Sequence, residues 1–378
     1  MKKHTTKWIA GIIIVIIVVL LIVSNVRTHK SDTIKIGYIS AMTGPAAKYG
    51  AYEAGKLAMD DINKNGGING KPLQVIFEDG KCDGATAVSA MNKLISVDKV
   101  DIVIGGHCSP ESVAIAPVAE QNKVIMLASI TTTPSLNNAG QYVFRTSPVS
   151  TIQSELTSQL AYKLGLRKFA VVYEQTAYAT PIAESLKTDF EKLGGTVLVY
   201  EGVTPGTTDY RTVLTKVKNS GADALLLSPQ SPDSALYMMQ QAKALGIKAK
   251  IFGNDVTSNQ VSINKNKDLF EGLIVTLPDF DRTNPKIFGF IKEYTDTYKA
   301  ADLPYGVWTA ETYDGVNIIA DALKANGDDV NKIKTFLEND VNGYHGVSGT
   351  ISIGKDHNGI RNYSLMIVKG GVVVSYNQ

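Results

Sequence analysis

Short apolar runs alternate with helical segments along most of the chain, and this alternation constrains the fold more than any other feature. Runs such as residues 34–40 (IKIGYIS) and 222–227 (ADALLL) are almost continuously apolar. Strands of this kind are buried on both faces, which requires a parallel sheet covered by helices on both sides. The pattern restarts after Arg145, and 378 residues suffice for two domains of about 150 residues. The sequence therefore predicts two α/β lobes, each with a Rossmann-like parallel sheet.

The C-terminal part of the chain is less regular and bears on how the two lobes are joined. Helical patterns are followed there by several short strands, and no low-complexity linker separates the two blocks. This order indicates that the chain returns to the first lobe and then crosses again.

The N-terminus differs from the rest of the chain. Lys2, Lys3 and Lys7 precede an apolar run over residues 8–23, which would span about 24 Å as a helix. That length lies between a signal-peptide core and a full membrane span. No small-x-small cleavage site and no cysteine follow the run, so residues 1–31 are predicted to be an uncleaved signal-anchor, a single transmembrane helix. The lysines would hold the N-terminus in the cytoplasm and place the bulk of the chain outside the membrane. Cleavage near residues 24–31 is the alternative.

Composition and motifs exclude several functions. The 38 basic and 36 acidic residues are intermixed, so no nucleic-acid partner is expected. The five histidines show no metal-ligand spacing and are interpreted as surface or loop residues, so no metal is expected. Residues 50–57 resemble a P-loop but end in Leu57 where Ser or Thr is required. Without a dinucleotide fingerprint or a nucleophile elbow, neither a cofactor nor an enzymatic activity is predicted.

Two cysteines, Cys82 and Cys108, are present. An extracytoplasmic location favours pairing them. Closing that loop would stabilise the fold by about 3–4 kcal/mol in the chain-entropy description. Two unpaired, buried thiols are the alternative.

Polar loops follow several predicted strands, at the edge where open α/β sheets bind ligands. Ser109 and Pro110 are typical of a helix N-cap and first turn, whose free backbone N–H groups favour an anion such as a carboxylate. Thr132 lies in a similar loop, and either residue could instead serve only as a cap. Asp255, after a strand of the second lobe, could face this pocket and accept an ammonium group, or could be an ordinary turn residue.

At these loops the sequence resembles the Leu/Ile/Val-binding protein family of branched-chain amino-acid ABC transporters. The resemblance runs from about Ile34 to the C-terminus and is carried by TGPAAKYG (43–50), INKNGGINGKPL (62–73), IGGHCSPES (104–112), QAKALGIKAKIFGND (241–255) and ETYDGV (311–316). It implies the type I periplasmic-binding-protein fold, with a hinge of three crossovers near residues 148–151, 278–281 and 346–349. The first lobe would then contain residues 32–149 and 280–347, and the second lobe residues 150–279 and 348–378. It also implies a disulfide between the two cysteines that would pin the loop carrying Ser109.

The resemblance implies a set of ligand contacts as well. Ser109 and Thr132 match residues that hold an α-carboxylate, while the carbonyl of Ile130 and the side chain of Asp255 match acceptors for an ammonium. Asp255 is shorter than the glutamate of the Leu/Ile/Val-binding protein, and Gln230 lies near a position where that protein has tyrosine. Pocket aromatics are matched by Tyr49 and Tyr178.

Together these features predict an extracytoplasmic solute-binding protein of an ABC importer, monomeric, that delivers an amino acid to permease subunits. Branched-chain amino acids are the first expectation for the solute, other neutral or polar amino acids are the second, and amides or urea-like compounds are the third. A ligand-sensing ectodomain that acts with a separate signalling partner is a further alternative. An extracytoplasmic enzyme would need a nucleophile, a metal or an acid pair in the cleft, and the sequence offers none.

Overall fold

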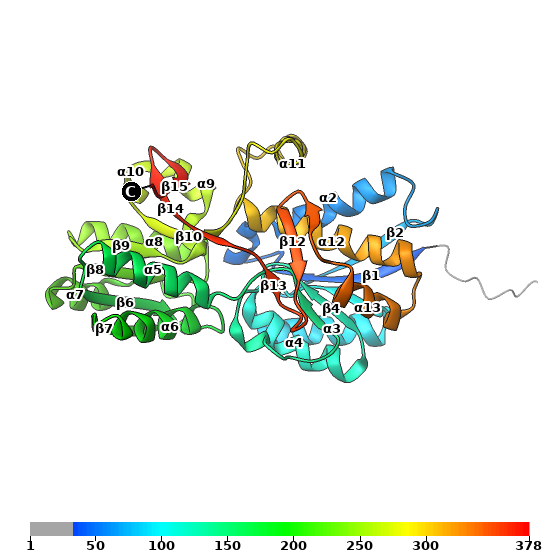
Figure 1. Ribbon diagram of the computed structural model, residues 1–378, viewed down its shortest axis with the longest axis horizontal. Coiled ribbons are helices and arrows are strands. Elements are labelled where there is room, and N and C mark those ends of the chain that lie inside the picture. The colour runs from blue at the N-terminus through cyan, green and yellow to red at the C-terminus, as the bar shows by residue number, and fades with distance from the viewer. Residues whose placement is uncertain (1–32, 378) are drawn as a thin grey trace, which may run out of the picture.

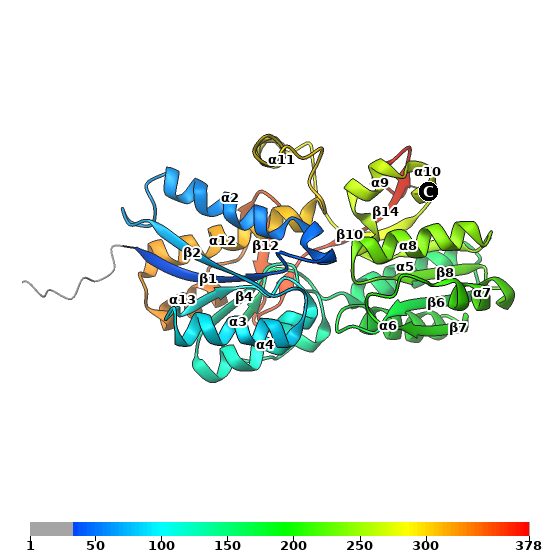
Figure 2. The ribbon, with the colours of Figure 1, turned by 180° about the vertical axis from the view of Figure 1, so that it is seen from behind.

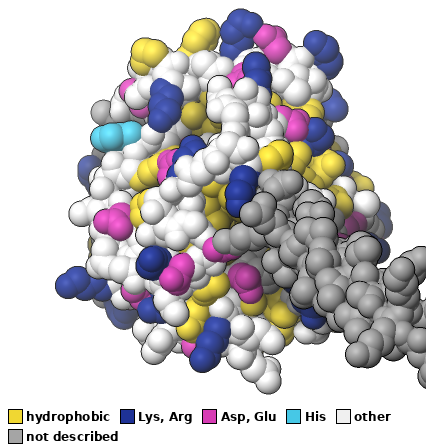
Figure 3. Space-filling model, turned by 90° about the vertical axis from the view of Figure 1, so that its right-hand side faces the viewer, with side chains coloured by type: hydrophobic (Ala, Val, Ile, Leu, Met, Phe, Trp, Pro, Cys, Tyr) yellow, Lys and Arg dark blue, Asp and Glu magenta, His cyan; other side chains and the backbone are white. Residues whose placement is uncertain are grey.

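The computed structural model describes residues 33–377, which form two lobes side by side (Figure 1). The predicted signal-anchor at residues 1–31 lies outside this range. Among the residues described, no helix combines the length and the apolar character that a membrane crossing requires. At the end of the first lobe, the face in Figure 3 shows acidic and basic side chains interspersed rather than gathered by sign.

The first lobe is built on a five-stranded sheet in the order β2-β1-β3-β4-β5, and every pairing is parallel. Helices α3 and α4 cover one face of this sheet, while α2, α12 and α13 cover the other (Figures 1 and 2). The strands are β1 (Ile34–Ser40), β2 (Leu73–Asp79), β3 (Ile102–Ile104), β4 (Ile125–Ala128) and β5 (Val143–Arg145), and the helices are α2 (Ala51–Lys64), α3 (Gly84–Ser96), α4 (Ser109–Asn122), α12 (Val307–Asn326) and α13 (Val330–Asn339).

Neighbouring residues of one strand enter opposite cores, which explains the continuous apolar runs. Ile102 and Ile104 pack beneath α12 and α13, whereas Val103 packs against α3 and α4. Both faces of the sheet are therefore covered by helices, and a ligand can reach the sheet only at the ends of its strands.

The second lobe contains a seven-stranded sheet in the order β15-β14-β10-β9-β8-β6-β7. Its central strands are parallel as expected, but β14 pairs antiparallel with β10, and β15 antiparallel with β14. The strands are β6 (Lys168–Glu174), β7 (Thr196–Val203), β8 (Ala224–Ser228), β9 (Lys250–Gly253), β10 (Ile274–Pro278), β14 (Tyr363–Lys369) and β15 (Val372–Ser375), and the helices are α5 (Thr151–Lys163), α6 (Ala179–Lys192), α7 (Arg211–Ser220), α8 (Pro232–Ala244), α9 (Gln260–Lys265) and α10 (Lys267–Phe270).

Three segments cross between the lobes. The first joins β5 to α5 over residues 146–150, and the second joins β10 to α11 (Pro285–Tyr298), which packs on α2 of the first lobe, over residues 279–284. The third joins β13 (Gly359–Ile360) to β14 over residues 361–362. The hinge therefore lies along one side of the interface, with the strand-end loops of both sheets beside it.

The expected third crossover at residues 346–349 was wrong. Gly346 pairs with Gly349 to close a hairpin between β11 (Tyr344–Gly346) and β12 (Gly349–Ile353). The turn is held by the Asp314 carboxylate, which accepts the N–H groups of Val347 and Ser348, each at 2.8 Å. Because Ile351 and Ile353 of β12 are buried in the core beneath α12 and α13, this strand lies on the first lobe.

Candidate functional site

A cavity lies between the lobes, at the ends of both sheets. The space between atoms there is about 420 Å³, part of it open to solvent. Six of the seven residues predicted to contact a ligand line this cavity; Thr132 does not. The lining residues are Tyr49, His107, Cys108, Ser109, Ile130, Tyr305 and Trp308 from the first lobe and Tyr178, Gln230, Asp255 and Val256 from the second.

Ser109 reaches the cavity at the N-terminus of α4. The structure places Cys108, rather than Ser109, at the N-cap, so that Ser109 and Pro110 are the first two helical residues. The Glu111 carboxylate accepts the N–H groups of Cys82 (2.8 Å), His107 (2.9 Å) and Cys108 (3.1 Å). These bonds fix the loop, and burial raises the pKa of Glu111 to about 7. The helix presents its positive end to the cavity, where an anion is stabilised.

The disulfide between Cys82 and Cys108 is confirmed, with the two Cα atoms 5.3 Å apart. It joins the loop after β2 to the N-terminus of α4 across a separation of 26 residues. The disulfide therefore restrains the loop immediately before Ser109 and the start of α4.

Asp255 comes from the opposite lobe, directly after β9. Its side chain is buried, accepts the Tyr178 hydroxyl, and accepts Nε2 of Gln153 at 3.2 Å. Burial raises the pKa of Asp255 to about 6, although the hydroxyl and amide donors favour the ionised form. Burial removes the water that would solvate the Asp255 carboxylate. A cation bound beside the carboxylate would stabilise it instead, because an opposite charge nearby lowers the pKa of an acid.

Contacts across the interface surround the cavity. The Tyr49 hydroxyl donates to the Gln230 carbonyl, and Gln230 Nε2 donates to the Tyr49 oxygen at 3.4 Å. The Tyr305 hydroxyl donates to the Val256 carbonyl at 3.1 Å. An exposed ion pair joins Lys48 to Asp233 at 2.5 Å. The lobes are thus in contact around the site, as expected for a closed arrangement.

Thr132 lies in the loop after β4 but is not one of the cavity-lining residues. It is buried, its hydroxyl has no hydrogen-bond partner among the described residues, and its carbonyl accepts the Ser150 N–H at 2.8 Å. Ile130, two residues earlier, does line the cavity. The structure therefore brings Ile130 to the site and leaves a ligand contact by Thr132 as a prediction.

His107 was missed by the sequence analysis, which treated every histidine as a surface or loop residue. It is only 2% exposed, lines the cavity and directs Nδ1 to the Ile39 carbonyl at 2.7 Å. Burial lowers its pKa to about 4, so the ring is neutral at physiological pH. Its position two residues before Ser109 could have indicated that it lies at the site. Nothing in the sequence indicated Trp308 and Tyr305, because they lie far along the chain at the start of α12.

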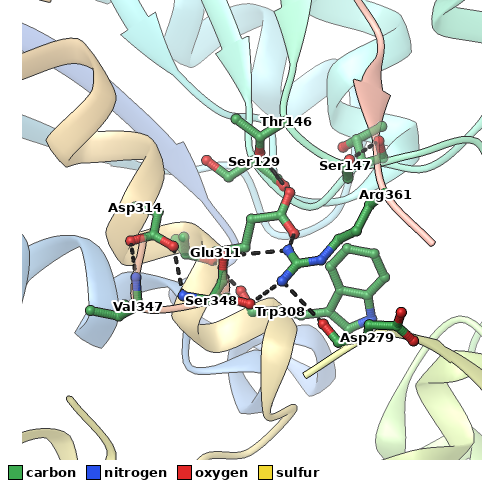
Figure 4. A network of polar contacts seen from close by, with 12 residues as sticks. Ser129, Thr146, Ser147, Asp279, Trp308, Glu311, Asp314, Val347, Ser348 and Arg361 are labelled. Carbon is green, nitrogen blue, oxygen red and sulfur yellow. Dashed lines mark hydrogen bonds and ion pairs between the residues drawn. The ribbon is translucent and has the colours of Figure 1, made fainter. Parts of the chain in front are cut away.

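One buried ion pair contacts all three crossovers beside the cavity (Figure 4). Glu311 of α12 accepts Arg361 Nη1 at 2.9 Å and the Thr146 hydroxyl at 2.7 Å. Arg361 also donates to the carbonyl of Asp279, at 3.2 Å, and to the carbonyl of Ser348. Thr146, Asp279 and Arg361 belong to the first, second and third crossovers, so the Glu311 side chain and its partner link the hinge strands.

Comparisons with known proteins agree with this geometry. A family model described as periplasmic binding protein matches residues 33–372. The leucine-, isoleucine-, valine-, threonine- and alanine-binding protein of Pseudomonas aeruginosa is 30% identical over 303 residues, covering 79% of this chain and 80% of that protein. The Leu/Ile/Val-binding protein of Escherichia coli is 27% identical, covering 82% and 84%. The branched-chain amino acid transporter substrate binding protein of Streptococcus pneumoniae, solved in complex with isoleucine, superposes with a TM-score of 0.81 at 27% identity, covering 90% and 97%.

Proposed function

This chain belongs to the periplasmic-binding-protein family and, within it, to the branched-chain amino-acid binding proteins; we therefore propose that it is the solute-binding component of an ABC importer and takes an α-amino acid between its lobes. One observation carries the proposal: a helix N-terminus from the first lobe and a buried carboxylate from the second line the same cavity. That pairing of opposite electrostatic ends suits a zwitterion.

In this proposal the carboxylate of the solute binds the first lobe. The Ser109 hydroxyl and the free N–H groups of α4 donate to it, and Thr132 contributes its unpartnered hydroxyl after a small shift. The ammonium group is held from two sides, by the Ile130 carbonyl and by the Asp255 carboxylate. Tyr49 and Tyr178 close over the solute, and Gln230 faces its side chain.

Closure follows from this division of contacts between the lobes. A solute on the first lobe alone would lack a partner for its ammonium, and only the closed form supplies Asp255. The solute therefore shifts the population toward the closed form by its differential affinity for the two forms. Permease subunits would recognise that form and accept the solute, and the binding protein would carry out no chemistry on it.

Location and assembly complete the proposal. Periplasmic binding proteins work outside the cytoplasm, and the disulfide between Cys82 and Cys108 is consistent with an oxidising compartment. We propose that the apolar run in residues 8–23 anchors this chain as a single-pass signal-anchor and that the binding lobes are monomeric. Size-exclusion chromatography with light scattering, and membrane fractionation of the full chain, test these two statements.

The test of function is a binding screen by isothermal titration calorimetry with about twenty amino acids. Each amino acid that binds is then compared with its analogues that lack the α-amino or the α-carboxyl group. The proposal expects an amino acid to bind and both analogues to lose at least about a hundredfold in affinity, because each leaves a buried charged or dipolar group unpaired. Equal binding of the amino acid and either analogue would refute it. Mass spectrometry of the recovered solute would reveal any turnover.

A further inference from the structure

An unpaired acceptor on His107 bears on which amino acid this cavity admits. The Ile39 carbonyl can only accept, so Nδ1 of the ring must carry the proton that it shares with that oxygen. Nε2 is then a lone-pair acceptor, and it is buried without a hydrogen-bond partner among the described residues. His107 is almost completely buried, so this lone pair has no direct access to bulk solvent.

A second residue that lines the cavity also carries an unpartnered acceptor atom. Gln230 lines the cavity from the opposite lobe, and its Nε2 is used by the Tyr49 oxygen. Tyr49 donates its own proton to the Gln230 carbonyl, which fixes the amide with Nε2, not Oε1, toward the tyrosine. The Gln230 Oε1 atom is consequently left buried without a partner in the described part of the chain.

The cavity wall offers no counter-charge for an ionised side chain. Among its lining residues only Asp255 is charged, and the proposed function assigns that carboxylate to the α-ammonium group. The low pKa of His107 keeps the imidazole neutral, so it provides no cation for an acidic solute. A lysine-like, arginine-like or glutamate-like side chain would be buried without a partner, which is costly.

Resting on the proposed function, we propose that the solute is a neutral amino acid whose side chain ends in a hydroxyl or a carboxamide, and that Nε2 of His107 and Oε1 of Gln230 accept its hydrogen bonds. His107 is thus a specificity-determining residue. A purely aliphatic side chain of the same size would leave both acceptors desolvated and unpaired. A donor-bearing side chain would satisfy one or both of them, since a hydroxyl carries one proton and a carboxamide two.

Two pairs of nearly isosteric amino acids test this inference by calorimetry. Threonine and valine differ by a hydroxyl for a methyl group, and asparagine and leucine by a carboxamide for an isopropyl group. We expect threonine to bind at least about tenfold more tightly than valine, or asparagine than leucine, because a site with buried acceptors rejects a ligand without donors. A preference for valine and leucine over their polar partners would overturn the inference.

Two variants of His107 separate its acceptor from its structural bond to Ile39. His107→Asn places an amide donor where Nδ1 lies and removes the Nε2 acceptor, whereas His107→Gln can place an amide oxygen near the Nε2 position. The preference for the polar partner should fall toward equality in His107→Asn and be largely kept in His107→Gln. Circular dichroism and thermal melting confirm that each variant is folded. An unchanged preference in a folded His107→Asn variant would refute a role for Nε2.

The outcomes distinguish this inference from the function on which it rests. If no amino acid binds, the proposed function fails. If amino acids bind and the aliphatic partner of each pair binds more tightly, the function stands and only the polar-side-chain inference fails. If the polar partner is preferred and the preference disappears in His107→Asn, both are supported.

Discussion

The ionisation of Asp255 should make solute affinity fall as the pH is lowered. Its pKa is raised by burial to about 6, and only the carboxylate form can hold an ammonium group. The sign follows directly: below about pH 6 the free protein carries a proton on Asp255 that must be lost on binding, so acid opposes binding. With that pKa, about 97% of the carboxylate is ionised at pH 7.5 and about 9% at pH 5, so the affinity should fall about tenfold between them.

The assay is isothermal titration calorimetry at pH 8, 7, 6 and 5 in buffers of equal ionic strength. The charge of an amino-acid solute hardly changes over this range, and the pKa of His107, lowered to about 4, keeps that ring neutral. Asp255→Asn is the matched control, because it keeps the size of the side chain and has no proton to exchange. It should bind weakly at every pH, and any pH dependence that it keeps measures the contribution of Glu111 and Glu311, whose pKa values burial raises to about 7. A wild-type affinity that is constant from pH 8 to pH 5 would refute the assignment of Asp255 to the ammonium group.

Three further predictions concern the scaffold and the hinge. Replacing both cysteines, Cys82→Ser with Cys108→Ser, should lower the free energy of unfolding by about 3–4 kcal/mol in denaturant titrations. An unchanged midpoint would mean that the disulfide, which joins residues 26 positions apart, does not restrict the unfolded chain. Arg361→Leu removes a cation that lowers the pKa of Glu311, so Glu311 must either stay ionised without its partner or take up a proton. The cost should be about 3–5 kcal/mol at pH 8 and less at pH 6, where a proton is more readily bound; an equal loss at both pH values would contradict this. Lys56→Ala, at an exposed ion pair, should cost no more than about 1 kcal/mol. Tyr49→Phe removes the donor to the Gln230 carbonyl and should weaken the closed form by about 1 kcal/mol, which lowers solute affinity about fivefold in calorimetry; an unchanged affinity would show that this contact does not contribute to closure.

Local patterns allowed the two lobes to be predicted because each strand and helix is determined by its own residues. Continuous apolar runs such as Ile34–Ser40 indicated buried parallel strands, and the structure has them. The antiparallel edge of the second sheet and the true third crossover could not be predicted in this way. Whether β12 joins one lobe or the other depends on Ile351 and Ile353 packing beneath α12, a contact with residues distant in the sequence.

The candidate site shows the same division. Ser109 and Asp255 were identified because each follows a strand, and strand ends are where open sheets bind ligands. His107 was overlooked because its burial depends on the Ile39 carbonyl, far away in the sequence, and a lone histidine in a loop carries no local signal of it. Thr132 had the expected position in sequence, yet its hydroxyl is buried and Thr132 is not one of the cavity-lining residues.

The most direct test of the account is a crystal structure of the protein with its preferred amino acid bound. The account predicts that the solute carboxylate lies within hydrogen-bond distance of Ser109 and the N-terminus of α4, and that the ammonium lies against Asp255 of the opposite lobe. A solute held by one lobe alone, or one with its ammonium turned toward α4, would contradict it.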